Sequence, residues 1–436
     1  MQYAANTLEN HWMPFTSNRD FKADPRLMVK AKGMHYWNHH GDKLIDASSG
    51  LFCCAAGHGR TEITDAVHAA MKEIDYTPHF QLGHPASFEL ARKVAKITPG
   101  DLDYVFFCNS GSEAVDTALK IAMAYHTAKG EGQRTKFVSR ERAYHGVNIG
   151  GVSLSGMVRN REAFGAVMPG VAHMRHTWSP DARFTRGQPE KGADLADDLQ
   201  RCVDLYGPKS IAACFVEPIA GSTGVLVPPK GYLERLREIC TRHGILLIFD
   251  EVITGFGRLG QPFASQRFGV TPDLFTAAKG LTNGTVPMGA VFVRDSLFDA
   301  FMQGPEGIEL FHGYTYSGHP VACAAGLGTL DTYADEELLT RAASLEHYWE
   351  DAAHALKGTR HVIDIRNIGL IAAIELEPRP GAPGRRAYEA FVKAFESGVL
   401  IRVTGDIIAL SPPLIVEKPQ IDRLFQTVRE VVQAAP

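Results

Sequence analysis

Short apolar runs recur along much of the chain and predict β-strands. They lie at residues 104–108, 211–216, 245–249, 274–278 and 290–293. The run at 245–249, with the sequence ILLIF, is apolar at every position. This pattern is typical of a strand that is buried on both faces, as in a parallel sheet covered by helices.

Segments with helical spacing alternate with these runs. The segment 112–127 places the following residues on one face: Ala114, Val115, Ala118, Leu119 and Ala122. The segment 232–243 also has an apolar face, and it is followed by Gly244, a residue that commonly ends a helix. Strands that alternate with helices predict an α/β fold with a large, doubly wound, mostly parallel sheet over about residues 55–320.

The pattern changes after Gly318. Longer helical segments follow at about 319–333, 336–357 and 386–397, with short predicted strands near 361–376 and 399–411 and a closing helix. This arrangement predicts a smaller α/β domain. We therefore divide the chain into a large domain over residues 55–320 and a small C-terminal domain over residues 321–436.

Residues 1–54 lack a strong core period but carry several aromatic side chains, including Trp12 and Phe15. We expect this segment to pack against other elements or another subunit, as part of the small domain and of the substrate entrance. Residues 1–15 have no apolar signal-peptide core. No apolar stretch approaches the ~20 residues of a membrane helix. We therefore expect a cytoplasmic protein.

The composition narrows the function. The chain has 436 residues, of which 45% are hydrophobic and 22% charged, as in globular proteins and unlike disordered, collagen or coiled-coil chains. Forty-five basic and 49 acidic residues give a net charge of −4. There is thus no basic excess to attract nucleic acid or anionic lipid, and a small molecule is the expected partner. Seven cysteines without Cys-x-x-Cys spacing predict reduced thiols rather than a zinc or thioredoxin motif.

The run NSGSE at residues 109–113 stands between a predicted strand and a predicted helix. Backbone N–H groups at a helix start, together with the hydroxyls of Ser110 and Ser112, can bind an anion. An ordinary helix N-cap, with Ser before the helix and Glu in its first turn, explains the same residues. Taken alone, the run does not decide between the two.

Two charged residues follow predicted strands. Asp250 ends the run at 245–249, and Lys279 ends the run at 274–278. In open α/β sheets, ligands bind beyond the carboxyl ends of the strands. There a buried carboxylate needs a cation or hydrogen-bond donors, and a desolvated lysine becomes a usable amine nucleophile. A structural salt bridge and a solvated loop lysine are the simpler alternatives.

Tyr144, in the run RAYHG at residues 142–146, can lie flat against a ring, although a core aromatic residue at a turn is the simpler interpretation. The 18 histidines include no His-Glu-x-x-His motif, so we expect no metal site. A phosphate cradle, an aromatic platform, a buried carboxylate and an amine together match one cofactor, pyridoxal 5′-phosphate.

With these residues, the sequence resembles a known family, the class III (ω-amino acid) aminotransferases of fold type I. The resemblance covers nearly the whole chain. It is strongest over residues 244–258, GILLIFDEVITGFGR, followed by PD at 272–273 and AKGL at 278–281. Within the family, the chain is most similar to the β-alanine or ω-amino acid:pyruvate aminotransferases.

The resemblance implies a role for each matching residue. Lys279 would form the Schiff base with the cofactor aldehyde, and Asp250 would hold the pyridine nitrogen. Tyr144 and Val252 would lie on opposite faces of the cofactor ring. The phosphate would be bound by Ser110, Gly111 and Ser112.

Further roles follow from the same resemblance. Thr315 would reach the phosphate of a neighbouring subunit, so a homodimer or a homotetramer with shared active sites is expected. Glu217 would lie near the cofactor. Arg402 would bind the acceptor's carboxylate, and Phe52 would line the pocket where relatives often carry Trp. Trp12 would line the entrance.

The loop 221–224, GSTG, departs from the ornithine and 4-aminobutyrate branches. Those branches carry a Glu in this loop that pairs with the arginine between half-reactions, and Ser222 replaces it here. An always available Arg402 fits pyruvate better than 2-oxoglutarate. The expected reaction is ping-pong transfer of an amino group from a small ω-amino acid or amine to pyruvate, giving alanine. The alternatives are a 2-oxoglutarate-using aminotransferase, an aminomutase, racemase or decarboxylase on the same fold, or a non-catalytic binding protein.

Overall fold

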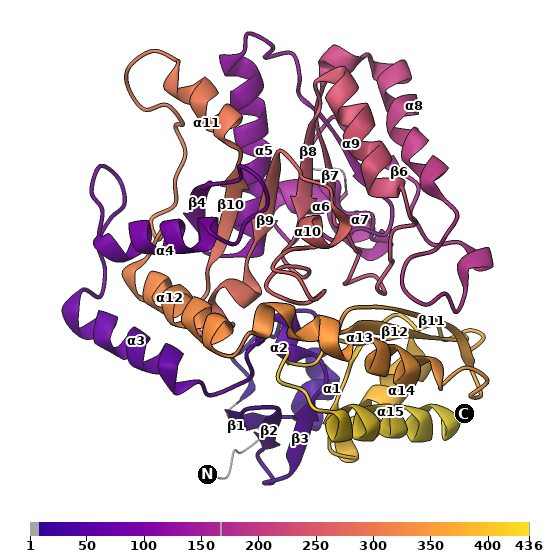
Figure 1. The fold of residues 1–436 in the computed structure, drawn as a ribbon. Coiled ribbons are helices and arrows are strands. Elements are labelled where there is room, and N and C mark those ends of the chain that lie inside the picture. Colours follow the sequence, from indigo (N-terminus) through magenta and orange to yellow (C-terminus); the bar gives the residue numbers. More distant parts are fainter. Residues whose placement is uncertain (1–7, 166–167, 436) are drawn as a thin grey trace.

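The computed structural model describes residues 8–165 and 168–435. A seven-stranded sheet forms its upper half in Figure 1, in the order β4-β10-β9-β8-β7-β5-β6. Its strands are β4 (Tyr104–Cys108), β5 (Lys136–Arg140), β6 (Val171–Met174), β7 (Ile211–Val216), β8 (Leu246–Asp250), β9 (Leu274–Ala277) and β10 (Gly289–Val293). All neighbouring pairs from β6 to β9 are parallel, whereas β10 runs antiparallel to both β4 and β9. The predicted α/β fold with a mostly parallel sheet is confirmed.

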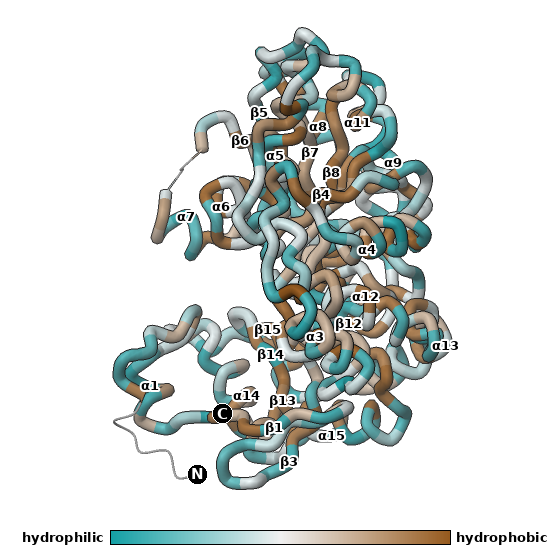
Figure 2. The backbone as a smooth tube through the Cα atoms, turned by 90° about the vertical axis from the view of Figure 1, so that its left-hand side faces the viewer, coloured by the Kyte–Doolittle hydropathy of each residue, from teal (hydrophilic) through white to brown (hydrophobic). Residues whose placement is uncertain are grey.

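The sheet is buried because helices cover both of its faces. In β8, Leu247 and Phe249 pack in the core on the side of α9 (Tyr232–His243), and Leu246 and Ile248 pack in the core on the side of α5 (Gly111–Ala128). Alternate side chains of one strand thus enter two different cores. This explains the unbroken apolar run, and Figure 2 shows the strands of this sheet as mainly hydrophobic.

Most predicted elements have bounds within one to three residues of those expected. The helix α9 ends as predicted, because Gly244 takes the left-handed conformation at its C-cap (φ 64°, ψ 29°). The strand β8 extends one residue further than expected, to Asp250. Asp250 is therefore the last residue of the strand itself.

The lower half of Figure 1 contains two smaller sheets. One is antiparallel, in the order β11-β12-β15-β14. Its strands are β11 (Val362–Ile368), β12 (Ile371–Leu376), β14 (Arg402–Thr404) and β15 (Ile407–Leu410). The C-terminal helices in this half are α12 (Pro320–Asp335), α13 (Leu338–His354), α14 (Arg385–Glu396) and α15 (Lys418–Gln433).

The other small sheet joins the two ends of the chain. It has the order β1-β2-β3-β13 and consists of β1 (Met28–Lys32), β2 (His35–Asn38), β3 (Lys43–Asp46) and β13 (Val399–Leu400). Strand β13 pairs in parallel with β3. N-terminal residues therefore lie beside the strand that leads to Arg402. The domain boundaries after residues 54 and 320 stay predictions.

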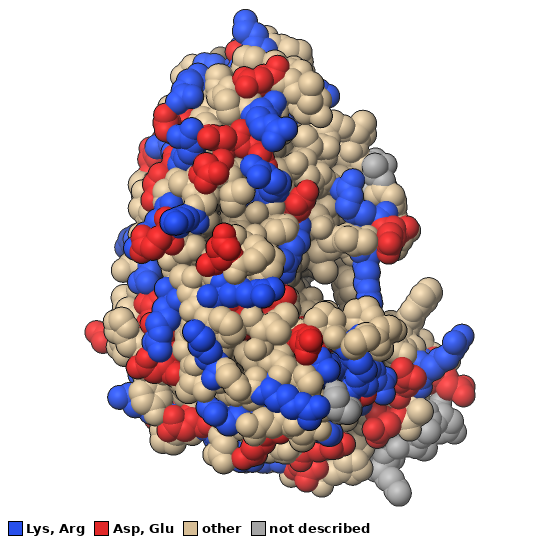
Figure 3. All heavy atoms as spheres, turned by 90° about the vertical axis from the view of Figure 1, so that its right-hand side faces the viewer, with Lys and Arg blue, Asp and Glu red and all other residues tan. Residues whose placement is uncertain are grey.

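The remaining helices are mostly short. They are α1 (Asn18–Ala23), α2 (Ser49–Phe52), α3 (Thr61–Glu73), α4 (Pro85–Ala95), α6 (Ile149–Leu154), α7 (Val158–Phe164), α8 (Asp197–Tyr206), α10 (Ala264–Phe268) and α11 (Asp295–Met302). Within the described residues, every helix is too short or too polar to cross a bilayer. Of the segment 1–15 considered for a signal peptide, residues 1–7 lie outside the described part. Acidic and basic side chains are interspersed over the face in Figure 3.

Candidate active site

Asp250 and Lys279 lie at the same edge of the large sheet. Strands β8 and β9 are parallel neighbours, with Asp250 paired in register with Thr276. Lys279 follows two residues after the end of β9. Because the carboxyl ends of parallel strands meet at one edge, the two predicted residues are brought together, as the sequence pattern indicated.

The Asp250 carboxylate is buried and held by three donors. One oxygen lies 2.8 Å from Nδ1 of His145, and the other accepts hydrogen bonds from the Val252 backbone N–H and the Thr276 hydroxyl, both at 3.2 Å. The other ring nitrogen of His145 lies 3.4 Å from the hydroxyl of Ser139. The RAYHG motif pointed to Tyr144, and the role of His145 beside Asp250 was not predicted.

Lys279 sits deep in the site, although part of its surface is open to solvent. Burial lowers the pKa of its amine from 10.5 to about 8, and the positive charge of Arg402 acts in the same direction. The nearby Cys53, Asp250 and Glu217 act in the opposite direction. About a tenth of this amine is therefore neutral one pH unit below that pKa, far more than for an ordinary lysine, and the neutral form is the one that acts as nucleophile or base.

The Phe52 ring contacts two cationic side chains. Nζ of Lys279 lies 5.6 Å from the ring centroid, and Cζ of Arg402 lies 5.8 Å from it. Phe52 is 5% exposed. The ring therefore brings the predicted lysine and the predicted carboxylate-binding arginine into one site.

Arg402 has no carboxylate partner among the described residues, and its buried Nε atom has no hydrogen-bond acceptor there. Burial lowers the pKa of its guanidinium, while the phenol of Tyr144 raises it. A desolvated cation without a counterion is unfavourable. The guanidinium is therefore available to an anionic ligand.

The start of α5 packs against the loop that follows β8. Ser110 is the N-cap, and its hydroxyl accepts from the Glu113 N–H at 3.2 Å, so the N-cap interpretation holds for this side chain. The Ser112 hydroxyl accepts from the Val147 N–H at 3.1 Å. A Cβ added to Gly111 would lie 3.1 Å from both methyl groups of Val252. The helix start thus packs closely against Val252, the residue two positions after Asp250.

Glu217 is buried behind Tyr144. Its carboxylate accepts hydrogen bonds from the backbone N–H groups of Tyr144 at 3.0 Å and Gly221 at 3.3 Å. Burial raises the pKa of Glu217 to about 7; the charge of Asp250 adds to this shift and His145 opposes it. Glu217 therefore holds the Tyr144 backbone in place, and its pKa depends on the charges of Asp250 and His145.

Two predicted site residues do not join this group within one chain. Thr315 is exposed, and its carbonyl accepts from the Tyr76 hydroxyl at 3.0 Å. Trp12 is 89% exposed. Among the described residues, neither Thr315 nor Trp12 forms a hydrogen bond, ion pair or ring contact with another predicted site residue.

Comparison with known proteins identifies the family. The aminotransferase class III family matches residues 16–432. The chain is 59% identical to an omega-aminotransferase of Caulobacter vibrioides, over 99% of this chain and 98% of that protein. The chain belongs to the class III aminotransferases.

Two further comparisons support this assignment. The chain is 49% identical to a beta-alanine–pyruvate aminotransferase of Pseudomonas aeruginosa, over 98% of this chain and 96% of that protein. It superposes on an omega transaminase of Pseudomonas jessenii in complex with PMP with a TM-score of 0.93 and 32% identity, covering 98% of this chain and 97% of that one. As a class III aminotransferase, the protein is a pyridoxal 5′-phosphate-dependent enzyme.

The residues present fit this cofactor. The amine of Lys279 has a lowered pKa, which suits it to react with an aldehyde. The Asp250 carboxylate is held by three donors, as a counterion for a protonated ring nitrogen should be. The N-terminus of α5 suits a phosphate, because the first-turn N–H groups before Glu113 are not used by the Ser110 cap and have no partner within the helix.

Cys53 lies near enough to Lys279 for the lysine's charge to act on its thiol. The sequence pattern predicted only that the cysteines are reduced thiols, with no place for any of them in the site. The Cys53 sulfur is 3.9 Å from that of Cys54. The Cys54 thiol lowers the pKa of Cys53, and the charge of Lys279 adds to the effect. The nearby Phe52 was the only residue of this turn that the family resemblance pointed to.

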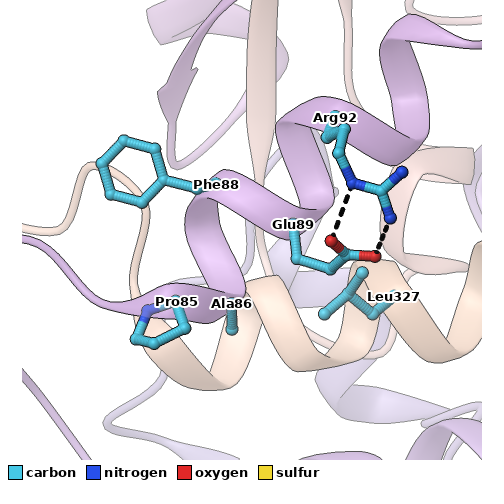
Figure 4. Close-up of a pocket in the computed structure, with 6 residues that line it drawn as sticks. All are labelled: Pro85, Ala86, Phe88, Glu89, Arg92 and Leu327. Carbon is cyan, nitrogen blue, oxygen red and sulfur yellow. Dashed lines mark hydrogen bonds and ion pairs between the residues drawn. The ribbon is translucent and has the colours of Figure 1, made fainter.

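A groove on the surface, away from Lys279, lacks the chemical groups of the site described above. It has a volume of about 600 Å³ between α4 and α12 and is lined by Pro85, Ala86, Phe88, Glu89, Arg92 and Leu327. Figure 4 shows its one cation, Arg92, already paired with Glu89. The groove contains neither an amine with a lowered pKa nor an unpaired cation. It is therefore a weaker candidate for the active site than the site around Lys279.

Proposed function

We propose that this enzyme transfers an amino group from a small ω-amino acid or amine to pyruvate and releases alanine. The observation that carries the proposal is the unpaired guanidinium of Arg402, which contacts the same Phe52 ring as Lys279. Such a cation can hold the carboxylate of an acceptor close to the reacting amine. The name of the relative at 49% identity, a beta-alanine–pyruvate aminotransferase, favours the same donor class and acceptor, and the relative at 59% identity is named an omega-aminotransferase.

The cofactor would be held by the residues that the family pattern matches. We assign covalent attachment to Lys279, the ring nitrogen to Asp250, and the ring faces to Tyr144 and Val252. We assign phosphate binding to the turn made of Ser110, Gly111 and Ser112, mainly through hydrogen bonds from its backbone N–H groups. When bound, the cofactor supplies an electron sink that stabilises negative charge on the substrate carbon.

Lys279 then acts as the base. Its Nζ would remove a proton from the carbon that carries the donor's amino group and would pass that proton on within the site to the bound cofactor, not back to the same carbon. A pKa of about 8 keeps a usable neutral fraction of the amine near physiological pH. His145 holds the Asp250 carboxylate in place through its 2.8 Å contact.

Arg402 orients the acceptor. A bidentate fork between its guanidinium and a carboxylate would fix both the distance and the angle of a short 2-oxo acid. The described chain offers no carboxylate that would have to be displaced first. This favours pyruvate over 2-oxoglutarate, whose second carboxylate needs another partner.

We further propose that the active unit is a homodimer or a homotetramer. Thr315 lies on the surface beside the exposed aromatic residues Tyr76 and Tyr316. An exposed aromatic cluster on a folded chain is typical of an interface. A second copy seated there would let Thr315 reach the partner's phosphate site. We place the enzyme in the cytoplasm, as its reduced cysteines favour.

The test is a donor and acceptor panel with purified enzyme. We expect a yellow protein whose cofactor is fixed on Lys279 by borohydride, and stoichiometric alanine from pyruvate with β-alanine or an amine as donor. The Lys279→Ala variant, prepared in parallel, should give neither the labelled peptide nor alanine. Glutamate formed from 2-oxoglutarate in preference to alanine would refute the acceptor assignment. Conversion of the donor without any alanine would instead indicate an aminomutase, racemase or decarboxylase.

A further inference from the structure

The turn that carries Phe52 has an unusual backbone. Within four residues, Ser49, Gly50 and Phe52 all have positive φ angles, of 47°, 66° and 62°. Such conformations at non-glycine residues cost on the order of 1–3 kcal/mol each and persist only where surrounding contacts impose them. Contacts around Ser49–Phe52 must therefore hold the turn in place.

Asp46, at the end of β3, holds one side of the turn. Its buried carboxylate accepts from the backbone N–H groups of Gly50 at 2.7 Å and Ser48 at 2.9 Å, and it lies 2.8 Å from the ring of His58. These contacts fix the entry to the turn. They leave the Ser49 side chain, on the other side, to be fixed by something else.

Arg258 provides that second anchor. Its guanidinium donates to the Ser49 hydroxyl at 3.1 Å and to the Pro412 carbonyl at 2.6 Å. The Ser49 hydroxyl in turn donates to the Ser411 carbonyl at 2.6 Å. The two nitrogens of one planar group thus tie the Phe52 turn to the segment that follows β15.

That segment leads directly to the substrate side of the site. Strand β15 pairs with β14, in which Arg402 lies opposite Ala409. The residues around Arg258 are themselves fixed, because a Cβ on Gly257 or Gly260 would lie within 3 Å of α13. Arg258 therefore links the rigid segment around Gly257 and Gly260 to two parts of the site. One is the turn that carries Phe52, and the other is the segment after β15, whose neighbouring strand carries Arg402.

Arg258 is expected to contribute little to the stability of the fold. It is 2% exposed, and no carboxylate within the described residues forms an ion pair with it. Burial lowers its pKa to about 10. A buried cation satisfied only by carbonyls and a hydroxyl is commonly less stabilising than an apolar side chain of the same volume. What it does provide is a fixed geometry.

We propose that Arg258 is a positioning residue, which acts through Ser49 to hold the Phe52 turn against Arg402 and thereby sets the affinity for the acceptor's carboxylate. The proposal rests on the proposed function, because it needs Arg402 to bind that carboxylate. It adds a determinant of acceptor binding that touches neither the cofactor nor the substrate.

The test compares Ser49→Ala, Arg258→Met and the control Arg267→Met. Ser49→Ala removes only the hydroxyl link and keeps the carbonyl contacts of Arg258, so this variant tests the proposal even if Arg258→Met does not fold. Arg267 also joins the large domain to α13, through Glu346, but lies away from the turn. All three are compared after scaling to the fraction of enzyme whose cofactor is fixed by borohydride.

We expect Ser49→Ala and Arg258→Met to raise the KM for pyruvate about tenfold while kcat changes less than threefold. Propionate, an unreactive carboxylate, should lose affinity by the same factor. Hydrogen exchange should speed up in a peptide covering residues 48–54. Arg267→Met should leave all three measurements unchanged. Unchanged KM, propionate affinity and exchange in Ser49→Ala would overturn the proposal. A wild-type enzyme that forms no alanine would refute the proposed function instead.

Discussion

The lowered pKa of Lys279 makes a prediction about stability that needs no cofactor. In the folded apoprotein the amine has a pKa of about 8, against 10.5 for an ordinary lysine. Below pH 8 the amine is protonated in both states, and the folded state bears the desolvation of that charge. Replacing it by an apolar side chain of similar length, in Lys279→Met, should therefore stabilise the apoprotein.

The size of this stabilisation follows from the difference between the folded and unfolded pKa values of Lys279, because proton binding and folding are thermodynamically linked. The difference of 2.5 pH units (10.5 minus 8) corresponds to about 3 kcal/mol at ~1.36 kcal/mol per unit. Because part of the lysine surface is open to solvent, we take about 3 kcal/mol as the upper bound. The sign is fixed, because between pH 8 and 10.5 the unfolded chain binds more protons than the folded chain. Wild-type stability therefore rises with pH across this window, and the advantage of the variant shrinks.

Urea denaturation of the two apoproteins measures this, at one protein concentration and in phosphate-free buffer. We expect Lys279→Met to be more stable at pH 7, with a gap that narrows steadily towards pH 10.5. Lys191→Met, at an exposed lysine, is the control and should show no pH-dependent gap. A variant that is no more stable than wild type at pH 7, or a gap that is constant with pH, would refute the burial argument for Lys279.

Three further predictions concern the other charged groups of the site. Asp250→Asn should keep a cofactor that borohydride fixes on Lys279 but lower kcat at least ~100-fold in the alanine assay, because the neutral amide does not stabilise a protonated ring nitrogen; an unchanged kcat would contradict the role. Arg402→Ala should raise the KM for pyruvate about 10- to 100-fold, as expected for a lost charge-assisted fork, with little effect on a carboxylate-free amine donor; equal effects on both would remove the carboxylate role. The folded pKa of Glu217, about 7, is above its usual 4.5, so wild-type stability should fall as pH rises from 4.5 to 7. Glu217→Gln should lose that slope in urea denaturation, and persistence of the slope would assign it to another group.

Local patterns were enough to predict the strand ends that carry chemistry. Asp250 and Lys279 each follow an apolar run, and parallel pairing of β8 with β9 then brings them to one edge. Helix bounds were also predictable, since Gly244 ends α9 by a local backbone preference. Predictions of this kind depend on residues within a few positions of one another.

Contacts between distant segments could not be predicted in the same way. Pairing of β3 with β13 joins residues about 350 positions apart, and nothing in either short strand specifies its partner. The hydrogen bond between Arg258 and Ser49 spans 209 positions, and His145 lies 105 positions from Asp250. The reversed direction of β10 likewise depends on the path of the preceding loop rather than on the strand's own apolar pattern.

The charges of the site differ from other buried charges in how the chain satisfies them. Away from the site, Glu251 accepts four hydrogen bonds from the start of α10 and from Thr254, and Arg366 pairs with Asp364 and Glu375. In the site, Arg402 has no counterion among the described residues, and burial lowers the pKa of Lys279 to about 8. A fold that satisfies Glu251 and Arg366 in this way, but leaves the Arg402 guanidinium without a counterion and desolvates the Lys279 amine, is arranged for ligands that complete these two groups. An aldehyde for the amine and a carboxylate for the guanidinium are the two complements, and an aminotransferase brings both to the same Phe52 ring.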